Sequence, residues 1–409
     1  MTEAVKVAFI DDGICEAFVD DDTVFESYIV ADGSVQACEH KKDILTHGTI
    51  CYKVFKDRVG SRYDLSSVQI LDDRMYSTDI DSLILALKWC NQNSIKLINL
   101  SLGTKIFFDI DKLLPIINDL AEAGVIIVCA CNNSNTITFP ACFENVIGVR
   151  HDTAEIYKTN FLYLPNPYDK IDIIAYSESM HVTLYEKDYS CDMNCFINKD
   201  MAGNCNRFDI TNVSQSLSSS PCNSNAAPLI TAIICNLIAE GITDLKNIRS
   251  ELVRTSLKGE QLYTYEFCKS KLRSWKKMKV PIVLYDCEQD ADHSKEFILE
   301  LLGKFKADGY QAVCFTDLFE TDIASHFFNI TYWKTVSLGD NIDLYFNFTD
   351  ADIIVMILGK SRMDEILELT QPDVIITERQ EYFSGGNSLL LYTKDCVLSI
   401  YNKMIGHLT

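Results

Sequence analysis

The sequence predicts an α/β fold with a mostly parallel sheet, followed by a smaller α/β domain at the carboxyl end. Three observations predict it. Short apolar runs alternate with segments of helical periodicity over the first two thirds of the 409-residue chain. These runs are rich in Val, Ile and Leu on both faces, which is typical of parallel strands covered by helices. After a basic stretch, residues 269–279, the same alternation starts again. Functional groups in such sheets gather at the carboxyl ends of the strands.

The first unit is expected to contain five parallel strands. They are residues 5–10, 68–71, 97–100, 125–130 and 146–149. Helices are expected at 80–93 and 111–122, where apolar residues recur at helical spacing, and Gly124 closes the second of them. Residues 151–222 show no regular pattern and are expected to form a variable loop region. Residues 226–240 are almost wholly apolar, which predicts a buried helix.

The second unit repeats the alternation on a smaller scale. Strands are expected at 282–285, 312–315, 353–358 and 374–377, and helices at 294–306 and 363–369. The chain therefore divides into a first domain (residues 1–259), a basic linker expected to be solvated (260–279) and a small accessory α/β domain (280–409).

Charge and cysteine content narrow the function classes. The chain has 37 Lys and Arg against 58 Asp and Glu, a formal net charge of −21. Such a protein is repelled by nucleic-acid phosphates and anionic membrane surfaces, so neither partner is expected, and basic peptides are favoured. No apolar run reaches the length of about 18 residues that a transmembrane helix needs. The 16 cysteines, in a chain that starts without a secretory signal pattern, predict reduced thiols and a cytoplasmic location.

Four short polar signals fall at strand ends or helix starts. They are Asp11 in Phe-Ile-Asp-Asp-Gly, His47 in Thr-His-Gly-Thr, Asn132 in Ala-Cys-Asn and Ser224 in Asn-Ser-Asn-Ala-Ala-Pro. Because strand ends and helix starts meet at one edge of a parallel sheet, these side chains are expected to lie together. A serine hydroxyl needs a base to become a nucleophile, and imidazole has a suitable pKa near neutrality. Asp12 remains an alternative to Asp11 as the acid.

These motifs, in the order Asp, His, Asn and Ser, resemble the subtilisin family of serine proteases. The run Ile-Asn-Leu-Ser-Leu-Gly at 98–103, the pair Phe-Pro at 139–140 and a closing helix at 248–257 carry the same resemblance. The likeness extends over residues 5–259. It implies a subtilisin-like three-layer fold for the first domain.

The resemblance also implies a role for each polar residue. His47 takes the proton from Ser224, and Asp11 orients the imidazole and stabilises its charged form. Asn132 donates its side-chain amide to the developing oxyanion, and the backbone N–H of Ser224 is the second donor. Pro228 is expected in the first turn of the helix that Ser224 opens.

Two segments are implied to hold the substrate. Ser101, Leu102 and Gly103 pair with an extended peptide as an added strand. The facing wall of the pocket consists of Cys129, Ala130 and Cys131. The family has glycine where Cys131 and Cys222 stand, so their side chains are expected to narrow the pocket or shift the backbone. No loop has the spacing of a ligand set, so no cofactor or metal is predicted, although structural calcium is common in the family.

The resemblance implies a serine endopeptidase that hydrolyses extended peptides through an acyl-enzyme. With the acid at Asp11, no pro-domain is expected. Family members of this cytoplasmic kind, with an extra carboxyl-terminal domain, occur in bacterial gene clusters for ribosomal peptides, where they remove the leader from a modified precursor. That role is expected here, with residues 280–409 helping to recognise the leader or a partner enzyme. The alternatives are a general intracellular turnover protease and a peptide-binding pseudoprotease whose pocket Cys131 and Cys222 block.

Overall fold

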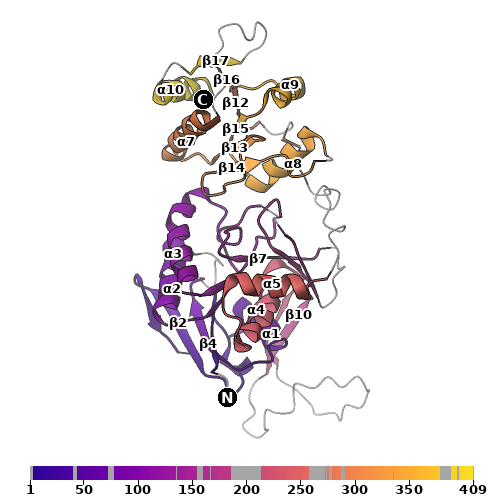
Figure 1. Cartoon of the computed structure of the whole chain (residues 1–409). Helices are drawn as coiled ribbons and strands as arrows, with labels where there is room; N and C mark the ends of the chain where they lie inside the picture. Colours follow the sequence, from indigo (N-terminus) through magenta and orange to yellow (C-terminus); the bar gives the residue numbers. More distant parts are fainter. Residues whose placement is uncertain are drawn as a thin grey trace.

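The computed structural model describes most of the chain. The described residues are 3–39, 44–71, 78–134, 136–153, 160–165, 167–185, 213–257, 272, 274–275, 279–286, 291–334, 336–377, 388–393 and 396–408. They form two layered units, with the second unit stacked on one end of the first (Figure 1). In these ranges no helix combines the length and the apolar character needed to cross a bilayer.

A nine-stranded sheet forms the centre of the first unit. Its order is β3-β2-β4-β1-β5-β6-β7-β9-β8. The strands are β1 (Val5–Asp11), β2 (Phe25–Ala31), β3 (Ser34–Ala37), β4 (Tyr63–Gln69), β5 (Leu97–Leu100), β6 (Ile126–Ala130), β7 (Ile147–His151), β8 (Phe161–Tyr163) and β9 (Ile173–Ala175). Neighbours pair in parallel except β2 with β3 and β8 with β9. The prediction of a mostly parallel α/β sheet is confirmed.

Helices cover both faces of this sheet and complete three layers. On one face lie α2 (Ile80–Gln92) and α3 (Ile110–Glu122), and on the other α1 (His47–Lys56), α4 (Asn223–Ala239) and α5 (Leu245–Thr255). Side chains alternate along each strand, so β1 sends Ala8 and Ile10 to the first cluster and Val7 and Phe9 to the second. Two short 3-10 turns, η1 (Glu16–Phe18) and η2 (Phe107–Asp109), lie in the connections.

The expectation of irregular structure over residues 151–222 is wrong in part. β8 and β9 extend the large sheet, and β10 (Met180–Tyr185) pairs antiparallel with β11 (Val213–Ser219). β11 reads Val-Ser-Gln-Ser-Leu-Ser-Ser, a serine-rich composition that resembles a loop. Residues 186–212 lie outside the described part of the chain. β4 also starts earlier than the strand predicted at 68–71, because its first half is only partly buried.

The second unit contains a six-stranded, all-parallel sheet. Its order is β14-β13-β15-β12-β16-β17. The strands are β12 (Ile282–Asp286), β13 (Ala312–Thr316), β14 (Phe327–Asn329), β15 (Ile353–Ile357), β16 (Val374–Thr377) and β17 (Leu389–Tyr392). The helices are α7 (Ala291–Ala307), α8 (Leu338–Thr349), α9 (Lys360–Leu369) and α10 (Val397–Leu408). The four strands and two helices predicted here are present.

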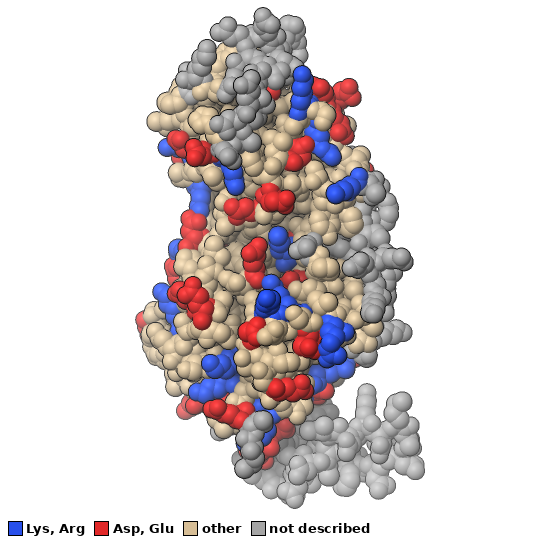
Figure 2. Space-filling view, viewed as in Figure 1, with Lys and Arg blue, Asp and Glu red and all other residues tan. Residues whose placement is uncertain are grey.

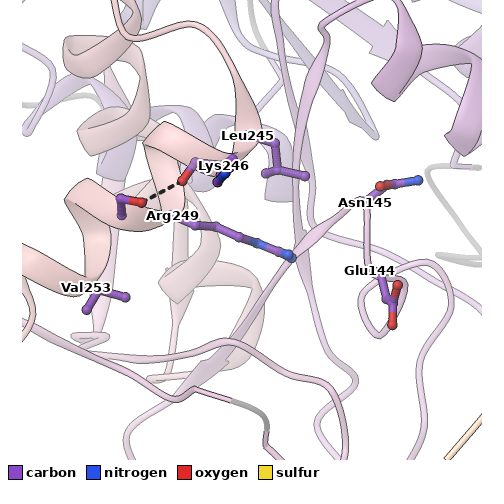
Figure 3. A pocket seen from close by; sticks show the side chains of 7 residues that line it. Glu144, Asn145, Leu245, Lys246, Arg249 and Val253 are labelled. Carbon is purple, nitrogen blue, oxygen red and sulfur yellow. Dashed lines mark hydrogen bonds between the residues drawn. The ribbon is translucent and has the colours of Figure 1, made fainter.

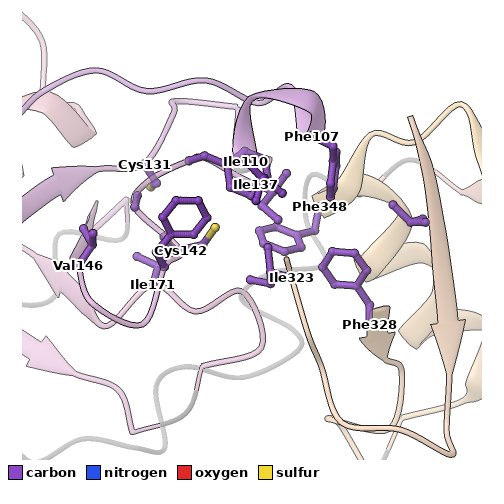
Figure 4. Packing of buried hydrophobic residues seen from close by; sticks show 14 of the residues in the cluster. Phe107, Ile110, Cys131, Ile137, Cys142, Val146, Ile171, Ile323, Phe328 and Phe348 are labelled. Carbon is purple, nitrogen blue, oxygen red and sulfur yellow. The ribbon is translucent and has the colours of Figure 1, made fainter. Parts of the chain in front are cut away.

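A continuous apolar cluster joins the two units (Figure 4). The ring of Phe107 lies 5.3 Å from that of Phe139 and 6.3 Å from that of Phe328 in the second unit, measured between ring centroids. The backbone N–H of Ile137 donates to the carbonyl of Phe348 over 2.7 Å. The second unit therefore packs directly against the loop that follows Asn132.

One part of the predicted basic linker is buried, which differs from the expected solvated connector. The side chain of Trp275 belongs to the apolar cluster and is 3% exposed. Its backbone N–H donates to the carboxylate of Asp343 in α8 over 2.7 Å. Because a large apolar ring gains free energy from burial and the backbone is hydrogen-bonded to α8, Trp275 is attached to the second unit.

Candidate active site

Asp11, His47 and Ser224 meet at the carboxyl edge of the large sheet. Asp11 ends β1, His47 begins α1, and Ser224 is the second residue of α4. Nδ1 of His47 lies 3.0 Å from each carboxylate oxygen of Asp11. Nε2 of the same ring lies 2.9 Å from Oγ of Ser224. The three side chains thus form one hydrogen-bonded chain in which the imidazole can accept the hydroxyl proton.

Asp12 holds the start of α1. Its two carboxylate oxygens accept from the backbone N–H groups of His47 (2.9 Å) and Gly48 (2.7 Å). These are donors that a helix start leaves without intrahelical partners. A Cβ at Gly48 would lie 2.4 Å from the carbonyl oxygen of Gly13, so only glycine lets α1 approach the end of β1 this closely. Asp11 therefore contacts the imidazole, while Asp12 fixes the backbone beneath it.

The surroundings of His47 favour its protonated form. A thiolate at Cys51 would raise the pKa of His47 most, and the carboxylate of Asp11 raises it as well, against the opposing effect of burial. Cys51 lies one helical turn after His47, with Sγ 3.8 Å from both ring nitrogens. Burial raises the pKa of the Cys51 thiol, so this sulfur is neutral near pH 7. Asp11 is thus the charge that stabilises an imidazolium at this position.

The start of α4 presents an open donor beside the nucleophile. Within the described residues nothing accepts from the backbone N–H of Ser224, because this group lies in the first turn of the helix, where no helical carbonyl precedes it. Pro228, which was expected in the first turn, is instead the sixth residue because α4 already begins at Asn223. The free N–H suits an oxyanion that forms next to Ser224 Oγ.

Asn132 is near this helix start, but its side chain is engaged within its own loop. Nδ2 donates to Oγ1 (2.5 Å) and O (3.2 Å) of Thr136, and Oδ1 accepts from the backbone N–H of Ser134 over 2.8 Å. The structure thus places the backbone of Asn132 beside the site without directing its amide at Ser224. An oxyanion role requires that the amide exchange these contacts for the substrate oxygen.

Asn133 and Asn223, neither of them predicted as a site residue, join the loops to α4. Asn223 donates from Nδ2 to the carbonyl of Asn132 over 2.7 Å and accepts from the backbone N–H of His151 over 2.7 Å. Oδ1 of Asn133 accepts from the backbone N–H of Asn223 over 3.1 Å. These hydrogen bonds join loops that are far apart in the sequence. The only signal for them in the sequence is the pair of adjacent asparagines, Asn132 and Asn133, after β6.

The predicted substrate-binding segments flank Ser224. Oγ of Ser101 donates to the carbonyl of Ser224 over 3.3 Å, and Gly103 is exposed. On the facing side, Cys129, Ala130 and Cys131 are 0%, 3% and 5% exposed. The Cys129 thiol donates to the carbonyl of Leu102 over 3.4 Å, so it is buried and joins the two predicted segments.

Cys222 adds a sulfur next to the nucleophile. Its Sγ lies 3.1 Å from Oγ of Ser224 and 3.8 Å from Oγ of Ser219. The residue caps α4 in an ordinary extended conformation, with φ −157° and ψ 170°. Cys222 therefore has a backbone conformation that any residue can adopt. Its side chain occupies space beside Ser224 Oγ that a glycine would leave empty.

One group of described side chains brings three potential metal ligands close together. Atoms of Asp11, His47 and Cys51 lie within 4.8 Å of one another. Asp11 and His47 also belong to the hydrogen-bonded chain that ends at Ser224, so an ion there would compete with the acid–base chemistry. A separate surface pocket of about 690 Å³ lies between α5 and the segment before β7, lined by Glu144, Lys246 and Arg249 among others (Figure 3). None of its lining residues belongs to the Asp11–His47–Ser224 chain.

Comparison with known proteins identifies the family of the chain. The profile of the subtilase family matches residues 2–267. The chain is 28% identical over 156 residues to the minor extracellular protease Epr of Bacillus subtilis (strain 168), a stretch that covers 36% of this chain and 23% of that relative. The chain thus spans well under two thirds of that relative's length.

Solved structures show partial similarity to the chain. A cold adapted subtilisin-like serine proteinase has a TM-score of 0.41 at 16% identity, covering 61% of this chain and 81% of its own. A lanthipeptide protease has a TM-score of 0.42 at 17% identity, with 60% and 78% covered. The prenylagaramide maturation protease PagA has a TM-score of 0.39 at 15% identity, with 61% and 82% covered. On the match of residues 2–267, the chain belongs to the subtilase family of serine peptidases.

Proposed function

We propose that this subtilase is an active serine endopeptidase that cleaves extended peptides through an acyl-enzyme, with Asp11, His47 and Ser224 as its catalytic residues. The observation that carries the proposal is the continuous chain from Asp11 through both ring nitrogens of His47 to Ser224 Oγ, at 3.0 and 2.9 Å. Each group has the partner that its role requires.

The geometry supports a defined order of proton transfers. As Ser224 Oγ attacks the substrate carbonyl, Nε2 of His47 takes its proton, and Asp11 stabilises the imidazolium. The backbone N–H of Ser224 donates to the new oxyanion. His47 then gives the proton to the leaving amine, the C–N bond breaks, and the acyl group remains on Ser224 until a water molecule, activated by His47, releases it. Asn132 is the proposed second oxyanion donor.

The proposed substrate is a ribosomally made precursor peptide whose leader is removed. Ser101–Gly103 present backbone groups to an extended chain, and Cys222 and the buried wall restrict the space beside Ser224. A narrow site suits one peptide better than many proteins. Figure 2 shows Lys and Arg interspersed with Asp and Glu on the face viewed, so no broad patch of one sign there selects the peptide by charge.

The proposed setting is a reducing, cytoplasmic compartment. Every cysteine in the described ranges is free, and most of these thiols are buried. A free thiol 3.1 Å from the nucleophile is a liability where oxidants are abundant, because oxidised Cys222 would obstruct Ser224.

Mass spectrometry of a modified precursor peptide tests the proposed role. We expect the wild-type enzyme to release leader and core by a single cut, and Ser224→Ala to leave the precursor intact. A protein without a matching site, such as casein, is the control and should stay whole. Cuts at many positions in casein would support a turnover protease instead. Binding of the precursor without cleavage by the wild type would support a pseudoprotease.

A further inference from the structure

The side-chain amide of Asn132 is bound at both ends by the loop that follows it. Nδ2 donates to Oγ1 of Thr136 over 2.5 Å and to the Thr136 carbonyl over 3.2 Å. Oδ1 accepts from the backbone N–H of Ser134 over 2.8 Å and from that of Thr136 over 3.3 Å. The backbone N–H of Ser224, by contrast, is open. Of the two proposed oxyanion donors, one is therefore in place before a substrate binds and the other is engaged elsewhere.

The backbone of this loop is anchored, so the amide can be released by turning the Asn132 side chain alone. The backbone N–H of Asn132 donates to Oγ1 of the buried Thr138 over 2.9 Å, and that hydroxyl donates to the Thr136 carbonyl over 3.1 Å. The backbone N–H of Ile137 donates to the carbonyl of Phe348 in the second unit over 2.7 Å. None of these bonds uses the Asn132 side chain, so all of them persist when the amide turns.

The hydroxyl of Thr136 is the closest acceptor of the amide. Within the described part of the chain it makes no other hydrogen bond, so it acts on Asn132 and on no other element of the fold. An oxyanion competes with this hydroxyl for the same N–H groups. A hydrogen bond to a charged acceptor is about twice as strong as one between neutral groups. The exchange is therefore favoured when negative charge develops on the substrate, and much less by a neutral carbonyl.

We propose that Thr136 is a positioning residue that holds the Asn132 amide out of the oxyanion site at rest, so that this donor is supplied only during the reaction. The inference rests on the proposed endopeptidase function and on the proposed role of Asn132. Releasing the amide from Thr136 offsets part of the stabilisation that it gives to the oxyanion. The Thr136 hydroxyl therefore lowers the rate at which Ser224 reacts.

Substitutions at Thr136 test this role through the second-order rate of labelling by an alkyl fluorophosphonate, whose phosphoryl oxygen takes the place of the oxyanion. Thr136→Val keeps the shape of the side chain and removes the hydroxyl. We expect it to be labelled about 5-fold faster than wild type, because one neutral hydrogen bond no longer competes for the amide. Thr136→Ala should show the same gain, and Thr136→Ser, which keeps the hydroxyl, should retain the wild-type rate. Thermal unfolding checks that each variant is folded.

A double-mutant cycle with Asn132 separates this role from a structural one. Asn132→Ala should slow labelling by roughly 10²–10³, the range for loss of one oxyanion donor. In the Asn132→Ala background Thr136→Val should bring no gain, because there is no amide left to release. A purely structural role of Thr136 would instead make the loss of its hydroxyl neutral or harmful in both backgrounds.

Three results overturn the inference while Ser224 is still labelled. They are folded Thr136→Val and Thr136→Ala proteins that react no faster than wild type, an equal gain in Thr136→Ser, and a gain that persists in the Asn132→Ala background. Failure of the proposed function gives a different result, because then neither the wild type nor any Thr136 variant is labelled at Ser224.

Discussion

Pro228 lies four residues after Ser224 in α4 and has no N–H to donate to the Ser224 carbonyl. That carbonyl instead accepts from the thiol of Cys51 over 3.4 Å and from the hydroxyl of Ser101 over 3.3 Å. A missing helical hydrogen bond thus lets α1 and the segment after β5 attach to the residue that carries the nucleophile. The Cys51 contact joins Ser224 to the helix that carries His47.

A double-mutant cycle tests this relationship. Ser101→Ala should lower the free energy of unfolding by about 1 kcal/mol, because the Ser224 carbonyl loses a donor. In a Pro228→Ala background the loss should be smaller, since an alanine at position 228 supplies a helical N–H to that carbonyl. Urea unfolding measures both values. Ser250→Ala, whose hydroxyl bonds to Lys246 in α5, is the control and should show no coupling to Pro228. Equal losses in both backgrounds would contradict the account.

The pH dependence of activity should report the charge of Asp11. His47 acts as a base only when unprotonated, and Asp11 raises its pKa, so the carboxylate moves the acid limb of the rate profile to higher pH. Asp11→Asn should shift this limb of kcat/KM to lower pH and reduce kcat by roughly 10⁴. Asp57→Asn, at the far end of α1, should change neither. An acid limb that stays in place in Asp11→Asn would show that another group determines it.

The stability that Asp12 contributes should fall as the pH rises, whereas most carboxylates of folded proteins contribute more stability at higher pH. Burial, and then the charge of Asp11, raise the pKa of Asp12 from 3.8 to about 6. The folded state therefore binds this proton more tightly than the unfolded chain does. Its contribution is present at low pH and is lost as the pH rises from about 4 through about 6.

Two variants separate the charge of Asp12 from its capping contacts. Asp12→Asn should flatten this part of the stability profile, because it removes the buried charge and keeps one acceptor. Asp12→Ala should flatten the profile too, and should in addition cost about 1–2 kcal/mol at pH 7 and more at pH 4, because both N–H groups at the start of α1 lose their acceptor. Thermal unfolding between pH 4 and 7 measures both effects. An unchanged profile for Asp12→Asn would rule out the charge as the cause.

The second unit should support the active-site loop. The ring of Phe348 is buried and lies 5.7 Å from that of Tyr168 and 6.2 Å from that of Phe328. Phe348→Ala should destabilise the protein by about 3–5 kcal/mol and lower kcat more than it raises KM, because the segment after Asn132 loses its support. Lys306→Ala is a control on the same interface, since it removes a more exposed ion pair with Asp111. Equal effects of the two variants on kcat would contradict this role.

The sequence was most informative where burial dictates the pattern. The strands at β1, β5, β6, β12 and β16 are buried on both faces, so their apolar runs could be recognised, and the polar residues at their ends could be placed at one edge. β2 and β11 escaped prediction because partly exposed strands tolerate polar residues.

Contacts between loops could not be read from the chain. The hydrogen bonds of Asn132 within its own loop depend on the turn that follows it. The contact between Thr138 and Gly103 joins residues from connections after two different strands, and only the folded arrangement brings them together.

Labelling of Ser224 by a fluorophosphonate tests the central claim most directly, because this reagent reacts only with a serine whose proton a neighbouring base removes. The account predicts stoichiometric labelling of the wild type at Ser224, no labelling of Ser224→Ala and strongly slowed labelling of His47→Ala, with all three proteins folded. A folded wild type that is not labelled, or a label on Ser224 that survives in His47→Ala at an unchanged rate, would contradict it.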